Sequence, residues 1–207
     1  MLDKLQECVR IGEDLGADFV EARYDDLTLR ALQRVKDIWQ DIQVKSRMGF
    51  AITAYVEGVS GFSFTPSTEM KDIRTTVEKA YRMAKASSKA AKLKLPFERK
   101  PAVKSKKSDT PSVKVHPRDK ELDFKIDMVN QVVESAIEYG ENIRNVQGRW
   151  GEFYGPKMMV NSDGSVIDWE FLVSDLRINV TSKTDAGALV LGAKSLCPMP
   201  ALFSIIS

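Results

Sequence analysis

Two stretches of the chain repeat apolar residues every three or four positions and then stop at a glycine. The first covers residues 2–15 and is followed by Gly16, and the second covers residues 122–139 and is followed by Gly140. A period of three to four is that of a helix with one buried face, and glycine suits the position after the last turn. The sequence therefore predicts a helix of about 13 residues at the start and a similar helix in the second half.

A third amphipathic segment runs from Ser67 to about Ala91. Its apolar positions recur at the same helical spacing, and they are Met70, Ile73, Val77, Ala80, Tyr81 and Ala84. Thr65 and Pro66 precede it, and threonine is a common N-cap while proline is favoured in the first helical turn. We expect a long helix that begins at this pair and packs one face on a sheet.

Strand patterns fill much of the first half. Residues 19–24 alternate between polar and apolar, and residues 49–58 and 59–66 are rich in β-branched and aromatic side chains on either side of Gly58. Residues 27–46 fit both a helical stripe and a strand alternation, so periodicity alone leaves their structure open.

The second half shows the same order of a helix followed by strands. The segments expected to be strands are residues 142–155, 157–162, 165–172, 175–183 and 188–194. The turn at Asn161-Ser162-Asp163-Gly164 is the strongest hairpin signal, because Asp-Gly supplies the positive φ that such a turn needs. A second turn is predicted at residues 183–187.

These patterns predict an α+β fold made of two blocks, each a helix plus a curved antiparallel sheet that is packed by a long helix. The expected division is 1–95 for the first block, 96–118 for a basic, proline-rich connector, 119–195 for the second block and 196–207 for a tail. A diverged internal duplication is possible, but no residue-level identity supports it.

Composition limits the classes of protein that this chain can represent. With 207 residues, 43% of them hydrophobic and 29% charged, it can bury one substantial core or two modest ones. No apolar run approaches the roughly 18 residues of a membrane-spanning helix, and the first residues lack the features of a signal peptide, so a cytoplasmic location is expected. Cys8 and Cys197 are too isolated to predict a disulfide framework or a metal knuckle.

Positive charge is concentrated in residues 85–120. That segment holds twelve Lys or Arg against three acids, a net charge of +9, which leaves −7 for the rest of a chain whose total is +2. Its densest part contains Lys100, Lys104, Lys106 and Lys107. Such a segment can attract nucleic acid or another acidic partner, or it can be a solvated connector. Phe97 is the only aromatic residue near these lysines, so a stacking platform for single-stranded nucleic acid is missing.

The residues offer no catalytic constellation. A catalytic zinc site needs about three protein ligands on rigid elements, and the chain has one histidine, His116, within the connector. The carboxylate pairs, such as Asp25 with Asp26, suit turns, and no phosphate-binding glycine loop is present. The sequence therefore predicts no catalytic residue and no metal ligand.

Three segments nevertheless resemble a known family. ADFVEARY at residues 17–24, GFAITAYVEGVSGFSF at 49–64 and VNSDGSVIDW at 160–169 are similar to the amino-terminal part of the TldD/PmbA family of metal-dependent peptidases. The resemblance extends from about Gly16 to Ser195. It implies that residues 27–46 form two antiparallel strands around a turn at Lys36 and Asp37.

The resemblance also defines what is missing. In the family, an HExxxH helix and a later cysteine hold the metal, and no residue of this chain corresponds to them. The chain is therefore expected to be a truncated, TldD/PmbA-like protein without activity alone, with zinc present only in full-length relatives. It would supply the substrate-binding and subunit-interface half. The alternative is a non-enzymatic adaptor that binds nucleic acid or an acidic partner through residues 85–120.

The family resemblance further suggests how a substrate is bound. An extended peptide is expected to lie against sheet edges, a mode that relies on main-chain hydrogen bonds and tolerates many sequences. The candidate contact residues form two groups in the second block. They are Met159, Val160 and Asn161 in the first group and Arg177, Asn179 and Thr181 in the second. Pairing with a second copy or with a paralogous subunit is expected, because edges and apolar surface would otherwise be open.

Overall fold

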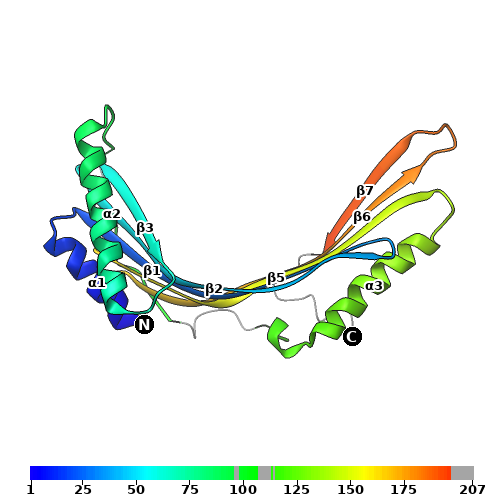
Figure 1. Cartoon of the computed structure of the whole chain (residues 1–207), viewed down its shortest axis with the longest axis horizontal. Coiled ribbons are helices and arrows are strands. Elements are labelled where there is room, and N and C mark those ends of the chain that lie inside the picture. The colour runs from blue at the N-terminus through cyan, green and yellow to red at the C-terminus, as the bar shows by residue number, and fades with distance from the viewer. Residues whose placement is uncertain (96–97, 107–112, 114, 197–207) are drawn as a thin grey trace. The chain divides into compact units, whose positions relative to one another are not determined.

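The computed structural model describes residues 1–95, 98–106, 113 and 115–196. Over these residues the chain forms three α-helices, one short 3₁₀ turn and seven strands, and the predicted α+β class is confirmed (Figure 1). The elements in chain order are α1 (Leu2–Asp14), β1 (Phe19–Val35), β2 (Ile38–Val56), β3 (Val59–Thr65), α2 (Met70–Ala90), β4 (Lys104–Ser105), the 3₁₀ turn (Pro117–Asp119), α3 (Leu122–Glu138), β5 (Ile143–Asn161), β6 (Val166–Lys183) and β7 (Leu189–Leu196).

The strands are ordered β3-β2-β1-β5-β6-β4, and β7 also pairs with β6. Antiparallel ladders join β2 to β3, with Phe50 opposite Thr65, and β6 to β7, with Leu176 opposite Leu196. The two-residue strand β4 is parallel to β6 and pairs Lys104 with Val166. Most neighbours in this order follow each other in the chain, so short turns make most of the connections.

The chain divides into two compact units, each assembled from three separate segments. Unit 1 consists of Met1–Leu27, Arg47–Thr110 and Gly155–Glu170, and unit 2 of Thr28–Ser46, Pro111–Tyr154 and Phe171–Ser207. Strands β1, β2, β5 and β6 each contribute residues to both units. The division predicted from the sequence follows chain order instead, and it stays a prediction.

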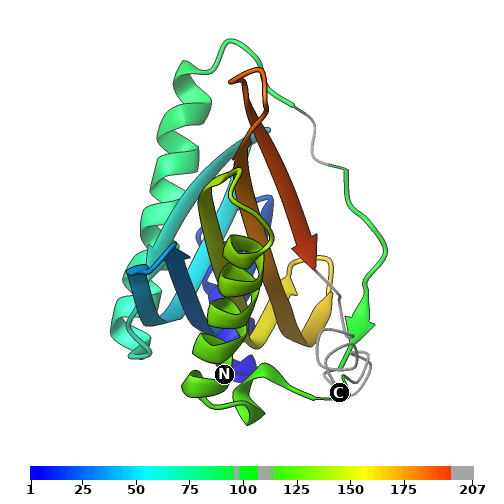
Figure 2. The same cartoon turned by 90° about the vertical axis from the view of Figure 1, so that its right-hand side faces the viewer.

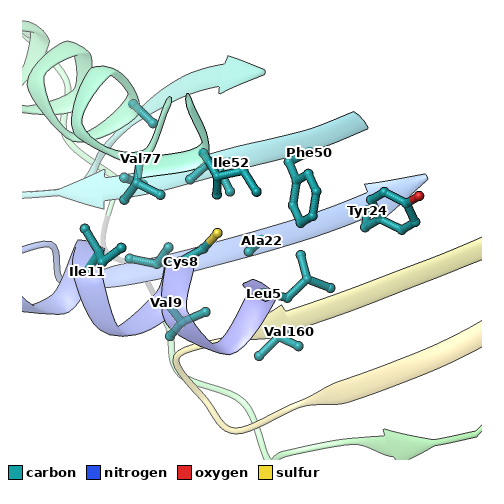
Figure 3. Close-up of a cluster of buried hydrophobic side chains, with 14 residues drawn as sticks. Leu5, Cys8, Val9, Ile11, Ala22, Tyr24, Phe50, Ile52, Val77 and Val160 are labelled. Atoms are coloured by element: carbon teal, nitrogen blue, oxygen red, sulfur yellow. The ribbon is translucent and has the colours of Figure 1, made fainter. Parts of the chain in front are cut away.

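Unit 1 has a core between its two helices and one face of its strands. Leu5, Cys8 and Val9 of α1 meet Ala22 of β1 and Ile52 of β2, as Figure 3 shows. Helix α2 packs against β3 and α1, and its buried residues have the predicted spacing. This arrangement leaves the opposite face of the unit 1 strands without a helix among the described residues.

Unit 2 has its own core beneath α3, which lies across the strands in Figure 2. Val129 and Val133 of α3 are fully buried with Trp150 of β5 and Leu32 of β1. Each buried side chain of this size contributes about 1.5–3 kcal/mol relative to an exposed position. One helix therefore buries one face of these strands, and the other face has no helical cover within the described ranges.

The helices are predicted well, with one error at a start. Helix α1 has the predicted 13 residues, and α3 ends just before Gly140. The expected capping role of Thr65 and Pro66 is wrong, because α2 begins at Met70. The Thr65 hydroxyl instead accepts a hydrogen bond from the Ser67 amide (3.1 Å), and the Ser67 hydroxyl accepts one from the Glu69 amide (3.1 Å). These local turns occupy the residues that would have formed the first helical turn.

The strands are longer than the sequence predicts. Breaks expected near Asp25, Arg47, Gly155 and Val173 are absent, so that eight expected segments join in pairs as β1, β2, β5 and β6. Each of the four places lies within three residues of a border between the two units. The apolar pattern is interrupted there because the strand leaves one core and enters the other, and the backbone pairing continues.

The predicted turns are confirmed. Residues Lys36 and Asp37 form the turn between β1 and β2, with Lys36 at φ 51°, and Glu57 and Gly58 have φ values of 49° and 77°. Positive φ at both central residues, as at Glu57 and Gly58, gives the twist that a two-residue hairpin needs. Gly164 has φ 81°, and its amide donates to the Asn161 carbonyl (3.0 Å).

Gly61 is required by the packing of α2 on β3. A Cβ atom at this position would lie 2.2 Å from the Ala80 carbonyl oxygen and 2.4 Å from the Ala84 nitrogen. Both neighbours are backbone atoms, so they cannot move without displacing the helix. A glycine at this strand position therefore sets the distance between α2 and the sheet.

Gly61→Ala is expected to destabilise the protein by about 1–3 kcal/mol, the usual cost of overpacking a core. Gly140→Ala is the matched control, since a Cβ there would meet nothing within 4 Å. Urea denaturation followed by circular dichroism measures both. Equal stability of the two variants would contradict this account of the α2–β3 contact.

Cys8 is buried in the unit 1 core, and this burial has a chemical consequence. Burial, assisted by the nearby Glu7 carboxylate, raises the pKa of the Cys8 thiol to about 12. At pH 8 only about one thiol in ten thousand would be ionised, and the thiolate is the reactive form. In a Cys197→Ser background, where Cys8 is the remaining cysteine, we expect no labelling by Ellman's reagent until guanidinium unfolds the chain. Rapid labelling of the folded protein would show that Cys8 is accessible.

Candidate binding surfaces

The first group of predicted peptide contacts is divided between the core and a turn. Val160 of β5 is buried in the unit 1 core, so it cannot touch a peptide without rearrangement. Asn161 ends the strand, and its side-chain oxygen accepts hydrogen bonds from the amides of Asp163 (3.1 Å) and Ser165 (3.0 Å). Met159 lies between Met158 and Val160, which both contact the core, and it therefore points to the helix-free side.

The second group lies on the helix-free face of unit 2. Ile178 and Val180 of β6 pack under α3, so Arg177, Asn179 and Thr181 point the other way. The Asn179 amide donates to the Gln147 side chain of β5 (3.1 Å), which places both residues on that face. Contact of these residues with a peptide stays a prediction.

Neither group lies at an edge of the sheet, so the expectation of an exposed edge there is wrong. β5 lies between β1 and β6 in the strand order. β6 has β5 on one side and β7 on the other, with Thr181 opposite Leu191. The backbone groups of both segments are thus engaged in ladders, and an added strand could not pair with them.

The open edge lies on β2 instead. Strand β3 pairs only with Phe50–Val56 of β2, and within the described residues no strand lies beyond residues 38–46. Residues 38–46 of β2, here called the β2 edge, therefore present a row of unpaired backbone groups. Such an edge is a ready template for another extended chain.

The β2 edge also carries exposed apolar side chains. Ile38, Ile42 and Val44 are 64%, 48% and 57% exposed, whereas Trp39 between them packs against the unit 2 core. Alternation along the strand places the three exposed residues on the helix-free face. Lys45 and Arg47 follow at its end, and charges of this kind limit unspecific edge pairing. The alternation of residues 38–44 in the sequence indicates a strand with one exposed face. It does not indicate that this strand lacks a neighbouring strand on one side.

The outer strand β7 is a second edge of unit 2. Leu189, Val190 and Leu191 are all at least half exposed, and they face both sides of the strand. β7 pairs with β6 along its length, so only its outer backbone groups are open. Unit 2 therefore has two open edges among its described strands.

A buried ionic group lies under α3. Glu152 of β5 accepts hydrogen bonds at Oε1 from Lys125 Nζ (2.6 Å) and Arg30 Nη1 (3.1 Å), and at Oε2 from Trp150 Nε1 (3.3 Å). Lys125 also donates to the Pro117 carbonyl (2.8 Å), and the Lys125 and Glu152 side chains are fully buried. Burial lowers the pKa of Lys125, while the Glu152 carboxylate opposes this effect.

The contacts of this buried ionic group indicate a structural role. Each carboxylate oxygen of Glu152 has a donor, and Lys125 connects α3 to β5 and to the 3₁₀ turn before the helix. A general acid or base would instead need reach to a substrate. The group therefore fastens the start of α3 onto the strands.

His116 is held by its neighbours. Its Nδ1 accepts hydrogen bonds from the Arg118 amide (3.1 Å) and the Arg118 guanidinium (3.2 Å), and its ring meets Tyr154 edge-on at 5.1 Å. Over the part of the chain that the structure describes, no three His, Cys, Asp or Glu residues are placed to hold a metal ion.

The basic connector is partly fastened to unit 1. Arg99 donates to the Asp18 carbonyl (2.6 Å) and to Asp163 (3.2 Å), and the Lys100 amide donates to Asp163 (3.1 Å). We call residues 98–106 the strap.

The predicted lysines of the connector lie in different places. Lys104 lies in β4 and pairs with β6, while Lys106 is exposed. Lys107 lies outside the described residues.

Comparison with known proteins agrees with this architecture. The family model described as PmbA/TldA metallopeptidase domain 1 matches residues 40–84. No curated protein matches the chain. Similar folds occur in two proposed modulators of DNA gyrase, from Bacteroides thetaiotaomicron (18% identity, TM-score 0.72) and Thermotoga maritima (13%, 0.66), and in TldE from Thermococcus kodakarensis (13%, 0.60).

These alignments cover 93%, 94% and 98% of this chain but 44%, 42% and 45% of the three structures. The chain therefore shares its fold with one part of each structure, and it spans less than half of their length. The predicted resemblance to the amino-terminal part of the TldD/PmbA family is confirmed. None of the helices among the described residues is long and apolar enough to cross a membrane.

Glu152→Ala is expected to destabilise the protein by about 3–5 kcal/mol, because it leaves Lys125 buried without its carboxylate. The control is Asp14→Ala, which removes an exposed ion pair with Arg10 and should cost less than about 1 kcal/mol. Equilibrium unfolding in urea measures both. A loss at Glu152 as small as that at Asp14 would contradict the fastening role.

Proposed function

We propose that this chain is a peptide-binding scaffold of a TldD/PmbA-type peptidase and has no catalytic centre of its own. The similarity to the amino-terminal part of that family supports the assignment. The sequence supports the lack of a centre, since one histidine cannot form HExxxH. Another chain or segment would then carry the metal and cleave the bound peptide.

The open β2 edge is the observation that carries this proposal. A peptide in extended conformation can continue the sheet there, with main-chain hydrogen bonds to residues 38–46. Its alternate side chains would contact Ile38, Ile42 and Val44 on the helix-free face. Because most of the contact is to the backbone, such an edge accepts many sequences.

The helix-free face of unit 2 supports the same role. Arg177, Asn179 and Thr181 supply polar groups, and Leu191 of β7 adds an exposed apolar one. A bound segment that turns onto this face would find hydrogen-bond partners there. A partner subunit could use the same face, which is the subunit-interface part of the proposal.

The contacts of the basic segment favour an anchoring role over a nucleic-acid site. Lys94 pairs with Glu57 (2.6 Å), Lys85 donates to Tyr81 (3.0 Å), and Arg99 is held by Asp163. These cations face protein acceptors within unit 1. The contacts of this segment therefore do not favour the adaptor alternative.

The test uses a fluorescent, end-capped peptide of alternating valine and serine, as long as the β2 edge, and measures anisotropy. The double variant Ile42→Lys/Val44→Lys should weaken binding at least about tenfold, because lysines oppose addition of a strand. A peptide with proline at alternate positions should also fail, since proline cannot donate to the ladder.

The matched control is Met83→Lys/Leu93→Lys, which changes two exposed apolar residues outside the edge. It should bind the peptide like the unaltered chain. The proposal is wrong if the unaltered chain does not bind the peptide, or if the Ile42→Lys/Val44→Lys variant binds it equally well.

A further inference from the structure

Unit 1 contains a hollow of about 320 Å³ that the proposed function does not use. Its floor is formed by strand residues that include Phe19 of β1 and Tyr55 of β2, whose rings meet edge to face at 5.8 Å. Glu98 and Lys100 of the strap form part of its wall. The volume is at the lower end of the range of small-molecule sites, about 300–1,000 Å³.

The wall is held in place by a fixed set of contacts. Arg99 lies between the two wall residues and reaches the Asp18 and Ser162 carbonyls and the Asp163 carboxylate. The Asp163 side chain is only 6% exposed and also accepts the Lys100 amide. Further along the strap, the Val103 amide donates to the Ser165 hydroxyl (3.0 Å), and the Val103 carbonyl accepts the Val166 amide (2.8 Å). The side chains of Glu98 and Lys100 are thus presented by an anchored backbone.

The hollow has three acidic residues and one lysine beside its aromatic residues, and two of the acids are already in ion pairs. Glu21, which also lines it, is already paired with Arg23 (2.7 Å), and Asp163 is paired with Arg99. Glu98 and Lys100 have no ion-pair partner among the described residues. They are two positions apart on an extended strap, and both line the hollow. One negative and one positive group are therefore available to a ligand.

We propose that this hollow binds a small zwitterion with an apolar side chain, namely a free amino acid or a dipeptide. The α-amino group would pair with Glu98 and the α-carboxylate with Lys100, and the side chain would lie on Phe19 and Tyr55. Aromatic surfaces and a few placed polar groups are the usual composition of such sites. An anion such as phosphate could not pair with Glu98, and a simple amine could not pair with Lys100.

Isothermal titration calorimetry with phenylalanine and with phenylalanyl-phenylalanine tests the proposal and distinguishes the two sizes of ligand. The blocked forms N-acetyl-phenylalanine and phenylalaninamide should each bind at least tenfold more weakly than phenylalanine, since each lacks one charge. If only the dipeptide binds, the same comparison is made with its acetylated and amidated forms.

Two variants assign the charges. Glu98→Gln should weaken binding of the free zwitterion and abolish the preference over the acetylated form, while the preference over the amide is kept. Lys100→Met should show the reverse. The controls are Glu13→Gln and Lys92→Met, which remove exposed charges outside the hollow and should leave binding unchanged. Circular dichroism verifies that each variant is folded.

Binding of neither zwitterion, equal binding of the blocked forms, or full affinity in both wall variants would overturn the proposal. The outcome is separable from that of the proposed function. Ile42→Lys/Val44→Lys should still bind phenylalanine or its dipeptide, and Glu98→Gln should still bind the end-capped valine-serine peptide. Each proposal can therefore fail while the other stands.

Discussion

The structure depends on strands that serve two separate hydrophobic cores. In β1, Ala22 and Tyr24 are buried with α1 and α2, and Leu32, further along the same strand, is buried with α3. β5 likewise contributes Val160 to the unit 1 core and Trp150 to the unit 2 core. β2 contributes Ile52 to the first core, and its Trp39 packs partly buried against the second. Each core is assembled from segments that are distant in the chain, so neither unit can form from one continuous stretch. The contacts that define a core are therefore of long range, which is the slow kind to form in folding.

Because each core lies on one side of its strands, every long strand has a second side that is free to take polar and half-buried residues. Unit 2 has Gln147 and Asn179 there, joined by a hydrogen bond. The edge of β2 is open for a similar reason, because β3 ends at Thr65 and does not pair with residues 38–46. A sheet with a covered edge would need another strand or loop there. The exposed Ile42 and Val44 lie at this uncovered edge, where the proposed peptide would contact them.

The sequence predicted what is set locally and missed what is set by distant partners. The helices, the hairpin at Lys36-Asp37 and the turn at Gly164 depend on neighbouring residues, and they were predicted closely. The continuity of β5 through Gly155 could not be predicted, because it depends on pairing with β1, which is distant in the sequence. The same reason explains the misplaced edge. Periodicity shows which side of a strand is buried, but the order of strands decides which strand has an open flank.

Some of the cations that cause the charge asymmetry of the sequence pair with acceptors within unit 1. An excess of cations in residues 85–120 suggests an anionic partner when the sequence is read alone, yet Arg99 finds Asp163 and two carbonyl groups within unit 1. Lys94 likewise meets Glu57. Exposed pairs of this kind add little stability individually. The contacts of Arg99 fix the proline-containing strap, which has no helix. The strap in turn forms part of the wall of the hollow beside Phe19 and Tyr55.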